Sequence, residues 1–344
     1  MRENYNDRMI GESSSFLSAQ EQVSRLAPLD KPALIIGERG TGKELVAARV
    51  HYLSERWGQA YLKVNCAAIS ESLIESELFG HELGAFSGAI RQHRGYFERA
   101  HGGTLFLDEI ATTSPRVQEK LLRLIEYGEL IRVGGDEVIE VDVRLVAASN
   151  SDLPGLARKN RFRSDLLDRL AFDVITLPPL RFRDEDIPLL ADYFAVRMVK
   201  ELDREYFPGF SADAAQSMRE YSWPGNVREL KNVVERAVYR SENPDDPIDQ
   251  IIYDPFDSPY RVLAHTDSIS TDDDMKVGPG PDSLTLPVPQ IRDLKEYIHL
   301  MEIKIINETW ESCQFNQRKT AEKLGLTYHQ LRAYKRKHSL FSTG

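Results

Sequence analysis

Hydrophobic and polar positions follow two different patterns along this chain of 344 residues. In its first half, short apolar runs at 33–36, 104–107 and 143–147 alternate with segments long enough for helices. This alternation is typical of βαβ units, in which helices cover both faces of a parallel sheet. The stretch 179–241 has the apolar spacing of helices only. We therefore expect an α/β domain over residues 1–178 and a small helical domain after it.

The last third of the chain has two contrasting parts. Residues 242–290 are rich in Asp, Pro and Ser and have few basic residues, which predicts an acidic flexible linker. Residues 291–344 have helical spacing again, and their segment 316–338 carries seven Lys and Arg against one acid. Two helices with a turn at Gly325 between them, the second capped by Thr327, predict a helix-turn-helix.

The second of these helices has the composition of a helix that lies in the DNA major groove. Tyr328, His329, Gln330 and Arg332 are expected near base edges, and Lys335 and Lys337 near phosphates. The alternative is a solvated basic helix. The residues expected to bind DNA are Thr327, Tyr328, His329, Gln330, Arg332, Lys335 and Lys337.

Charge and composition change this picture in one respect. The net charge of −10 argues against nucleic-acid binding when it is taken alone. The basic segment accounts for +6, however, so the remainder is strongly acidic and DNA contact is expected from the tail alone.

Cys66 and Cys313 cannot form a disulfide framework, and neither a secretory signal nor an apolar run long enough to span a membrane is found. We expect a cytoplasmic protein.

A glycine-rich loop follows the first apolar run and precedes a helical pattern. Such a loop folds its backbone N–H groups around phosphates, and its lysine supplies a charge for the outer phosphates. Glu44 stands where the usual pattern has a Ser or Thr that holds magnesium. A chance glycine-rich turn is the alternative. The residues expected to bind nucleotide are Gly37, Glu38, Arg39, Gly40, Thr41, Gly42, Lys43 and Glu44.

Two acids, Asp108 and Glu109, end the apolar run at 104–107. Ligands bind at the carboxyl ends of parallel strands, so Asp108 is expected to hold magnesium, directly or through water. Glu109 is expected to polarise the water that attacks the γ-phosphate of ATP. The alternative is a solvated strand end with no chemical role.

Further along the chain, the segment Gly84-Ala85-Phe86-Ser87-Gly88-Ala89 resembles the GAFTGA signature of the AAA+ bacterial enhancer-binding proteins, the sigma-54-dependent transcription activators. The segments 162–170 and 223–230 and the C-terminal helix-turn-helix match the same family. The resemblance implies an AAA+ P-loop NTPase with an α-helical lid over residues 179–241 and a Fis-type helix-turn-helix. It also implies ATP and Mg²⁺ as cofactors and a homo-hexamer as the active form.

The resemblance assigns roles to single residues. In this family the GAFTGA loop contacts sigma-54, here residues 84–89, with Phe86 as the candidate apolar contact and Ser87 in place of the usual Thr. Arg163 and Arg169 match arginine fingers that reach the nucleotide of a neighbouring subunit; the alternative is an ion pair with Asp165 or Asp168 of the same chain.

Other residues match by position. Arg228 matches the sensor II arginine of the lid. Asn65 matches the residue that holds the catalytic Glu away from water, with a structural role as the alternative, and Asn150 lies in the sensor I region. The family usually has a Glu between Arg181 and Arg183, where this chain has Phe182, and no function is assigned to that difference.

The layout, with no receiver domain before the ATPase, most resembles the members of the family that control phage-shock operons. That resemblance implies an inhibitory partner, phage shock protein A. Trp57 stands in polar surroundings after the P-loop helix and is the candidate contact. Packing of this indole in the core is the alternative.

Together these features predict an activator that binds upstream enhancer DNA. Its hexameric ring would use ATP hydrolysis to remodel the closed complex of sigma-54 RNA polymerase into the open complex, for a phage-shock (envelope stress) operon. A nucleotide-gated DNA-binding repressor without promoter remodelling is the main alternative. An AAA+ motor that acts on DNA, such as a helicase loader, is a third. The protein is expected in the cytoplasm, associated with the nucleoid.

Overall fold

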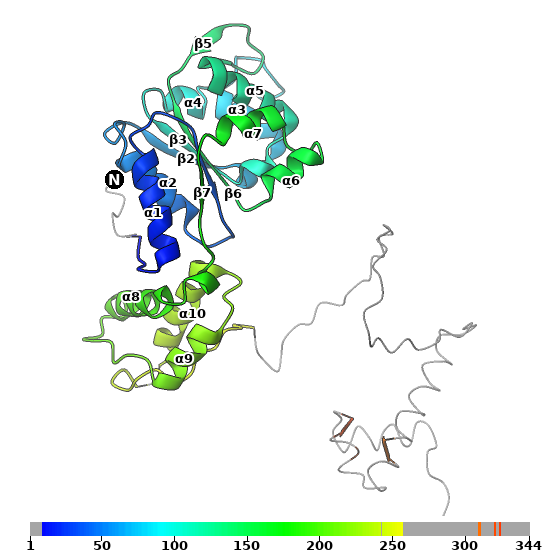
Figure 1. Ribbon diagram of the computed structural model, residues 1–344. Helices are drawn as coiled ribbons and strands as arrows, with labels where there is room; N and C mark the ends of the chain where they lie inside the picture. Colours follow the sequence, from blue (N-terminus) through cyan, green and yellow to red (C-terminus); the bar gives the residue numbers. More distant parts are fainter. Residues whose placement is uncertain (1–8, 242, 257–308, 311–319, 321–322, 325–344) are drawn as a thin grey trace, which may run out of the picture. The chain divides into compact units, whose positions relative to one another are not determined.

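The computed structural model describes residues 9–241, 243–256, 309–310, 320 and 323–324 (Figure 1). The chain divides into two units, Met1–Val262 and Leu263–Gly344. Almost all of the described residues belong to the first unit. The predicted helix-turn-helix and its DNA-binding residues lie outside the described residues, apart from 309–310, 320 and 323–324, and stay a prediction.

A five-stranded sheet forms the centre of the first unit, and all its neighbouring strands are parallel. The strand order is β2-β3-β6-β1-β7. All six residues of β6 are buried, as expected for a parallel strand that is covered on both faces. The strands are β1 (Ala33–Ile36), β2 (Tyr61–Asn65), β3 (Thr104–Asp108), β6 (Arg144–Ser149) and β7 (Val174–Thr176).

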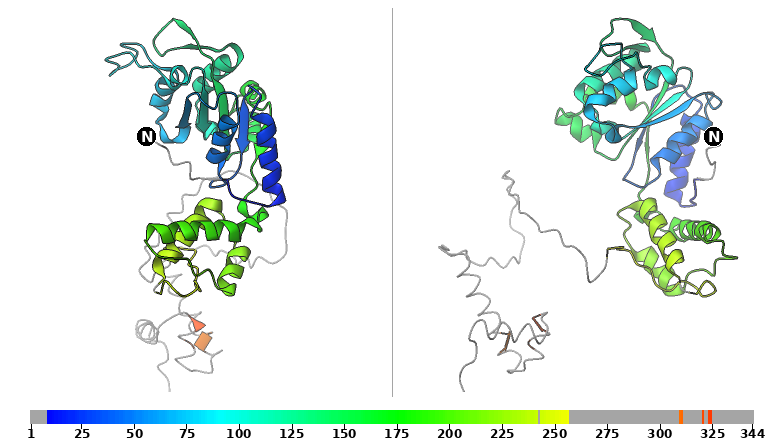
Figure 2. Two further views of the ribbon diagram at one scale, coloured as in Figure 1. Left: turned by 90° about the vertical axis from the view of Figure 1, so that its left-hand side faces the viewer. Right: turned by 180° about the vertical axis from the view of Figure 1, so that it is seen from behind.

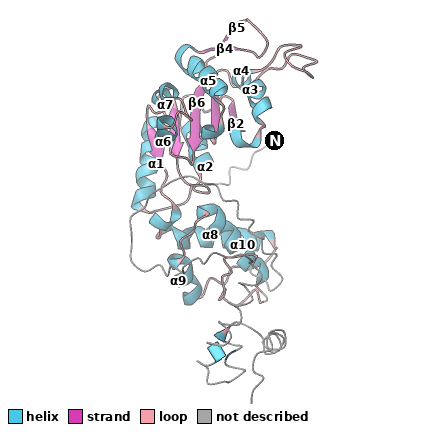
Figure 3. Cartoon of the chain, turned by 90° about the vertical axis from the view of Figure 1, so that its right-hand side faces the viewer, coloured by secondary structure: helices cyan, strands magenta, loops and turns pink. Residues whose placement is uncertain are grey.

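Helices cover both faces of this sheet (Figures 1 and 3). Alternate residues of a strand point to opposite faces, so Ile35 of β1 joins the core under two helices while Leu34 joins the core under five others. One face carries α1 (Ser14–Leu26) and α2 (Lys43–Tyr52). The other carries α3 (Glu71–Phe79), α4 (Tyr96–Arg99), α5 (Pro115–Tyr127), α6 (Leu153–Arg158) and α7 (Ser164–Leu170), with the short 3-10 turns η1 (Cys66–Ala68) and η2 (Ile110–Thr112).

A small antiparallel hairpin, β4 (Glu129–Ile131) with β5 (Val138–Glu140), lies apart from the main sheet, beyond the end of α5 (Figure 1). Next to it runs the loop between α3 and α4. Backbone hydrogen bonds join the two segments, among them one from the Glu82 N–H to the Val133 carbonyl, 3.0 Å long. The loop that resembles GAFTGA is therefore carried by this hairpin and by α3.

The helical domain follows β7 through the 3-10 turn η3 (Leu180–Phe182) and consists of α8 (Asp186–Glu201), α9 (Ala212–Glu220) and α10 (Asn226–Arg240) (Figure 2). Trp223 fills its core, and its indole Nε1 donates to the Met218 carbonyl at 2.8 Å. Residues 243–256 also pack here: Ile248 is buried, and Tyr253 stacks on Tyr221 with centroids 4.1 Å apart. The packed helical body thus continues beyond residue 241.

Among the residues that the structure describes, no helix has the length and apolar character needed to cross a membrane.

Candidate nucleotide site and contact loop

The glycine-rich loop joins the end of β1 to the start of α2 and wraps around one lysine. Gly40 and Gly42 have φ angles of +79° and +98°, a region that favours glycine. The Lys43 side chain is 7% exposed, and its Nζ donates to the carbonyls of Gly37 and Glu38 at 2.9 and 3.2 Å. Burial lowers the pKa of this ammonium, and the nearby carboxylates of β3 oppose the shift. The loop therefore places a buried cation at the carboxyl edge of the sheet.

The two acids stand at the same edge. The Glu109 N–H donates to the Asp108 carboxylate at 3.0 Å. Glu109 itself has a φ of +54°, and its buried side chain accepts a 3.0 Å hydrogen bond from the Asn150 amide. Arg39 of the glycine-rich loop lies 4.0 Å from the same carboxylate oxygen. The structure thus brings the loop, the β3 acids and the end of β6 together.

Asn65 has a different contact from the one that the resemblance implies. It lies in register with Asp108 on the neighbouring strand, and its side-chain oxygen accepts from the Ala67 N–H at 2.9 Å, which caps η1. The amide that holds Glu109 is that of Asn150, a residue that the sequence placed only in a general region. Spacing along the chain could not show which of the two asparagines, Asn65 or Asn150, holds the Glu109 carboxylate.

Glu44, the last residue of the predicted nucleotide-binding set, points toward the edge of the sheet. Its carboxylate forms a 2.9 Å ion pair with Lys63 of β2, and both side chains are exposed. Glu44 is therefore held away from the buried lysine, whereas Asp108 and Glu109 are both close enough to act on its charge.

The helical domain closes the other side of the glycine-rich loop. Gly40 lies against the carbonyl of Gly225 and against the Cβ of Arg228, so a side chain at Gly40 would collide with the helical domain. Arg228 is also close enough to Lys43 for its charge to lower the pKa of that ammonium. The predicted sensor II arginine and the predicted phosphate loop are thus neighbours in the fold.

Two contacts of this junction were missed by sequence reasoning. The Arg181 guanidinium pairs with both carboxylate oxygens of Glu38, at 2.6 and 2.9 Å. Asn226 is the first residue of α10, after the N-cap Gly225, and its amide donates to Glu38 and to the Arg39 carbonyl at 3.1 and 3.0 Å. These hydrogen bonds lower the pKa of Glu38 to about 2.

A mainly apolar cavity of about 80 Å³ adjoins the start of α2. Four separate segments line it, which is why no single motif could reveal it. The chain near residue 10 is held there because the buried Asp186 carboxylate accepts from the N–H groups of Glu12 and Ser13 at 2.6 and 2.9 Å. The lining residues are Met9, Ile10, Phe16, Thr41, Gly42, Leu45, Val46, Arg183, Leu190, Tyr193, Phe194 and Val227.

The two predicted arginine fingers lie at the ends of α7 and have partners in their own chain. Arg163 forms a 2.7 Å ion pair with Asp165, and Arg169 a 3.0 Å ion pair with Glu126 of α5. The sequence offered Asp165 or Asp168 as partners, and Glu126 was not foreseen. Both guanidinium groups are substantially exposed, so a second chain could compete for them.

The loop that resembles GAFTGA presents apolar side chains to solvent. Phe86 is 40% exposed, and Leu83 and Ile90 are more exposed still. Gly84 and Gly88 have φ angles of +80° and +110°, and a Cβ at either would meet open space. The Phe86 ring leans edge-on against the His81 imidazole, 5.0 Å between centroids. An exposed apolar tip on a glycine-flanked turn fits a protein-contact loop.

The base of this loop, by contrast, is held by charge. Arg132 of the β4–β5 segment bridges Glu82 and Glu98 at 2.7 and 2.6 Å, and these hydrogen bonds lower the pKa of both carboxyl groups.

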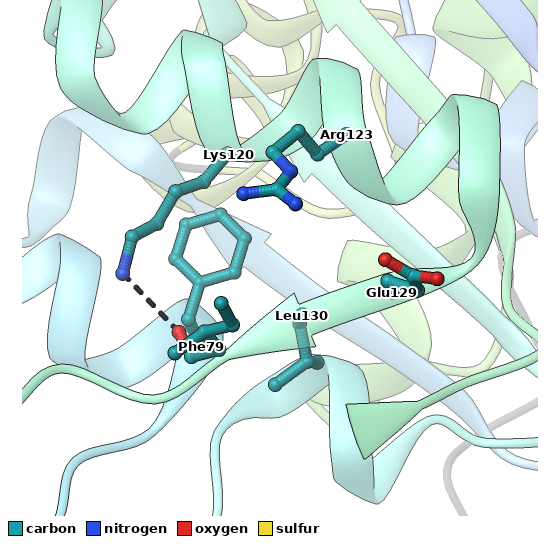
Figure 4. A pocket seen from close by; sticks show the side chains of 6 residues that line it. Phe79, Lys120, Arg123, Glu129 and Leu130 are labelled. Atoms are coloured by element: carbon teal, nitrogen blue, oxygen red, sulfur yellow. Dashed lines mark hydrogen bonds between the residues drawn. The ribbon is translucent and has the colours of Figure 1, made fainter. Parts of the chain in front are cut away.

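A small cavity of about 70 Å³ lies beside the β4–β5 hairpin, where Lys120 crosses the Phe79 ring and donates to the Ile131 carbonyl at 3.2 Å (Figure 4). The cavity lies between α5 and the hairpin. Its lining residues are Phe79, Lys120, Arg123, Glu129, Leu130 and Ile131.

Trp57 lies in the turn that follows α2, and its side chain is 68% exposed. The alternative that its indole packs in the core is therefore wrong. Its neighbour Arg56 is anchored by Asp30 and Asp142 at 2.7 and 2.6 Å, which fixes the turn that presents the indole.

Comparison with known proteins agrees with this geometry. Residues 9–176 match the family model of the sigma-54 interaction domain, and residues 181–250 match that of the AAA+ ATPase lid domain. The Psp operon transcriptional activator of Escherichia coli K12 is 54% identical over 338 residues, which are 98% of this chain and 99% of that protein. The Nif-specific regulatory protein of Klebsiella pneumoniae is 45% identical over 75% of this chain and 49% of its own length.

Solved structures resemble the chain as well. NtrX from Brucella abortus has a TM-score of 0.68 at 28% identity, over 96% of this chain and 69% of NtrX. NtrX in complex with ATP has a TM-score of 0.67 at 28% identity, over 97% of this chain and 69% of NtrX. The chain belongs to the sigma-54 interaction domain family of transcription activators, whose AAA+ module is a nucleotide-binding ATPase and whose partner is sigma-54.

Proposed function

We propose that the chain hydrolyses ATP in a homo-hexameric ring and uses this energy to convert the closed complex of sigma-54 RNA polymerase into the open complex. The observation that carries the proposal is the meeting of the buried Lys43, Asp108 and Glu109 at one edge of the sheet, in a chain that also exposes the Phe86 loop. Family membership favours an activator and does not support the alternative of a repressor without remodelling.

ATP would bind between the glycine-rich loop and the helical domain. The N–H groups at the start of α2 and the Lys43 ammonium would receive the phosphates, and Arg228 would approach them from the lid. The apolar cavity beside Gly42 suits the nucleobase. Glu109 would polarise the attacking water, and the Asn150 amide would set the direction of its carboxylate.

Magnesium would be held by Asp108, because a carboxylate oxygen is a ligand that this ion prefers. Glu44 is engaged with Lys63 and is not needed. The described residues contain no cluster of three or more His, Cys, Asp or Glu side chains that could hold a metal, which fits an ion that shares its ligands with phosphates and water. When bound, the ion neutralises charge on the phosphates.

Arg163 and Arg169 would serve the nucleotide of the neighbouring subunit. Each would exchange an exposed carboxylate of its own chain, Asp165 or Glu126, for the γ-phosphate across the interface. A guanidinium supplied in trans stabilises transition-state charge and increases the rate by about a thousandfold or more. Hydrolysis would then depend on assembly of the ring.

Purified full-length chain tests the proposal with sigma-54 RNA polymerase on a supercoiled template, by permanganate reactivity of melted promoter DNA. We expect melting with ATP, and none with a non-hydrolysable analogue or with the Lys43→Ala chain. ATP turnover without promoter melting would contradict the proposal.

The regulated promoter is proposed to be that of a Psp operon, because identity to the Psp operon transcriptional activator extends over nearly all of both chains. The C-terminal segment would bind the enhancer. If Arg332 reads a base there, Arg332→Ala should cost about 1–3 kcal/mol of binding to the cognate site and little on random DNA. An equal loss on both DNAs in a gel-shift titration would reject this role.

Inhibition by phage shock protein A would use the exposed indole of Trp57. Such a surface aromatic on an anchored turn is a suitable centre for a protein interface. Trp57→Ala should keep ATP turnover and abolish its inhibition by the partner. Unchanged inhibition would remove Trp57 from the interface.

A further inference from the structure

The glycine-rich loop carries an acid at a place where negative charge opposes its proposed task. Glu38 lies in the loop itself, and its carbonyl accepts from the Lys43 ammonium at 3.2 Å. Backbone N–H groups and a lysine attract phosphate, whereas a carboxylate in the same loop repels it. The position of the Glu38 side chain therefore affects nucleotide binding.

Two residues of the helical domain hold this carboxylate. Arg181 forms two parallel hydrogen bonds with it, at 2.6 and 2.9 Å, and both side chains are 41% exposed. The Arg181 guanidinium also lies over the Phe182 ring, 5.3 Å from the centroid. A bidentate pair of this kind fixes direction as well as charge.

Asn226 completes the arrangement from inside the junction. Its fully buried amide donates to Glu38 and to the Arg39 carbonyl, and its oxygen accepts from the Leu180 N–H at 2.8 Å. The backbone of Asn226 has a φ of +54°, which asparagine tolerates better than most residues. One side chain thus joins the loop, the start of the helical domain and the first turn of α10, which also carries Arg228.

We propose that Arg181 and Asn226 are positioning residues of the nucleotide site: they bind the Glu38 carboxylate to the lid and neutralise it, so that the phosphate loop can accept a nucleoside triphosphate. A shift of the lid would release this carboxylate toward the loop, which links nucleotide affinity to lid position. The proposal rests on the proposed nucleotide site.

The exposed pair gives the cleaner test, because Asn226→Ala would leave the buried Leu180 N–H and Arg39 carbonyl without partners and endanger folding. Binding of a fluorescent ATP analogue to the full chain is measured by anisotropy. Arg181→Gln should weaken binding about fivefold, since it leaves an unpaired carboxylate in the loop. Glu38→Gln should tighten binding about twofold, because it leaves the Arg181 charge free for the phosphates.

The double variant Glu38→Gln/Arg181→Gln distinguishes a charge effect on nucleotide binding from a contact that only supports the fold. With both charges absent, its affinity should return to within about twofold of the parent chain. A contact that only supports the fold predicts the opposite result: both single variants weaken binding and the double variant is no better than Arg181→Gln.

Arg25→Gln is the matched control, because it removes one arginine from an exposed ion pair with Glu21 on α1. It should bind like the parent chain. The Arg181→Gln defect should also shrink as salt increases, as expected for a screened charge effect. A defect below twofold at low salt, or a double variant as weak as the single one, overturns the proposal. A parent chain that binds no nucleotide would instead overturn the proposed nucleotide site.

Discussion

The proposed phosphate loop (residues 37–44) and the proposed contact loop (residues 84–89) both depend on glycines. The two loops differ in what surrounds those glycines. Gly40 and Gly84 have nearly the same φ, +79° and +80°. Gly40 is pressed against the Gly225 carbonyl and Arg228, whereas no neighbouring atom lies near the Cβ position of Gly84. In the first case glycine allows two domains to approach, and in the second it shapes a turn that leaves Phe86 exposed.

The side chains follow the same division. Around the phosphate loop, charged and amide groups are paired, as with Glu109 and Asn150 or Glu38 and Arg181. At the contact loop the base is fixed by charge, through Arg132, and the apolar side chain of Phe86 is left 40% exposed. The comparison suggests that chemistry needs side chains held in place, whereas a partner needs an apolar surface that the chain leaves uncovered.

The largest expected effect is on hydrolysis. Glu109→Gln keeps the shape of the side chain and removes the base, so ATP turnover should fall by about 10²–10³-fold. Binding of the fluorescent ATP analogue should remain, because Lys43 and the loop are intact. Turnover within a few-fold of the parent chain would mean that Glu109 is not the base.

The two asparagines near Glu109 separate a positioning role from a capping role. Asn150→Ala removes the amide that directs Glu109 and should lower turnover about tenfold. Asn65→Ala removes the η1 cap and should cost about 1 kcal/mol of stability with a smaller effect on turnover. Steady-state ATPase assays and thermal melts measure both. A larger loss of turnover in Asn65→Ala would restore the role implied by family resemblance.

The stability of two alanine variants compares the two glycines directly. Alanine at either position should lower the stability of the fold by a similar amount, about 1 kcal/mol, because both positions have a positive φ. Gly40→Ala should lose about 1–3 kcal/mol more, because its Cβ collides with the Gly225 carbonyl. Thermal melts of the two full-length variants should therefore show a lower midpoint for Gly40→Ala. Equal midpoints would show that the loop and lid separate without cost.

Sequence patterns predicted the features that depend on short segments. The parallel strands, the glycine-rich loop and the acids after β3 are each specified by neighbouring residues, and the structure has them at one edge. Contacts between distant segments could not be predicted. Packing brings the Glu38 loop within reach of the Asn226 amide, and it places Arg169 beside Glu126 of another helix.

The most direct measurement compares ATP turnover and promoter melting on the same preparations of parent chain and Phe86→Ala. We expect ATP turnover within about twofold of the parent, since Phe86 lies outside the nucleotide site, and loss of promoter melting by sigma-54 RNA polymerase. Phe256→Ala, which removes another exposed phenylalanine, should retain both activities. Promoter melting that survives Phe86→Ala would contradict the assignment of the 84–89 loop as the part of the chain that acts on sigma-54.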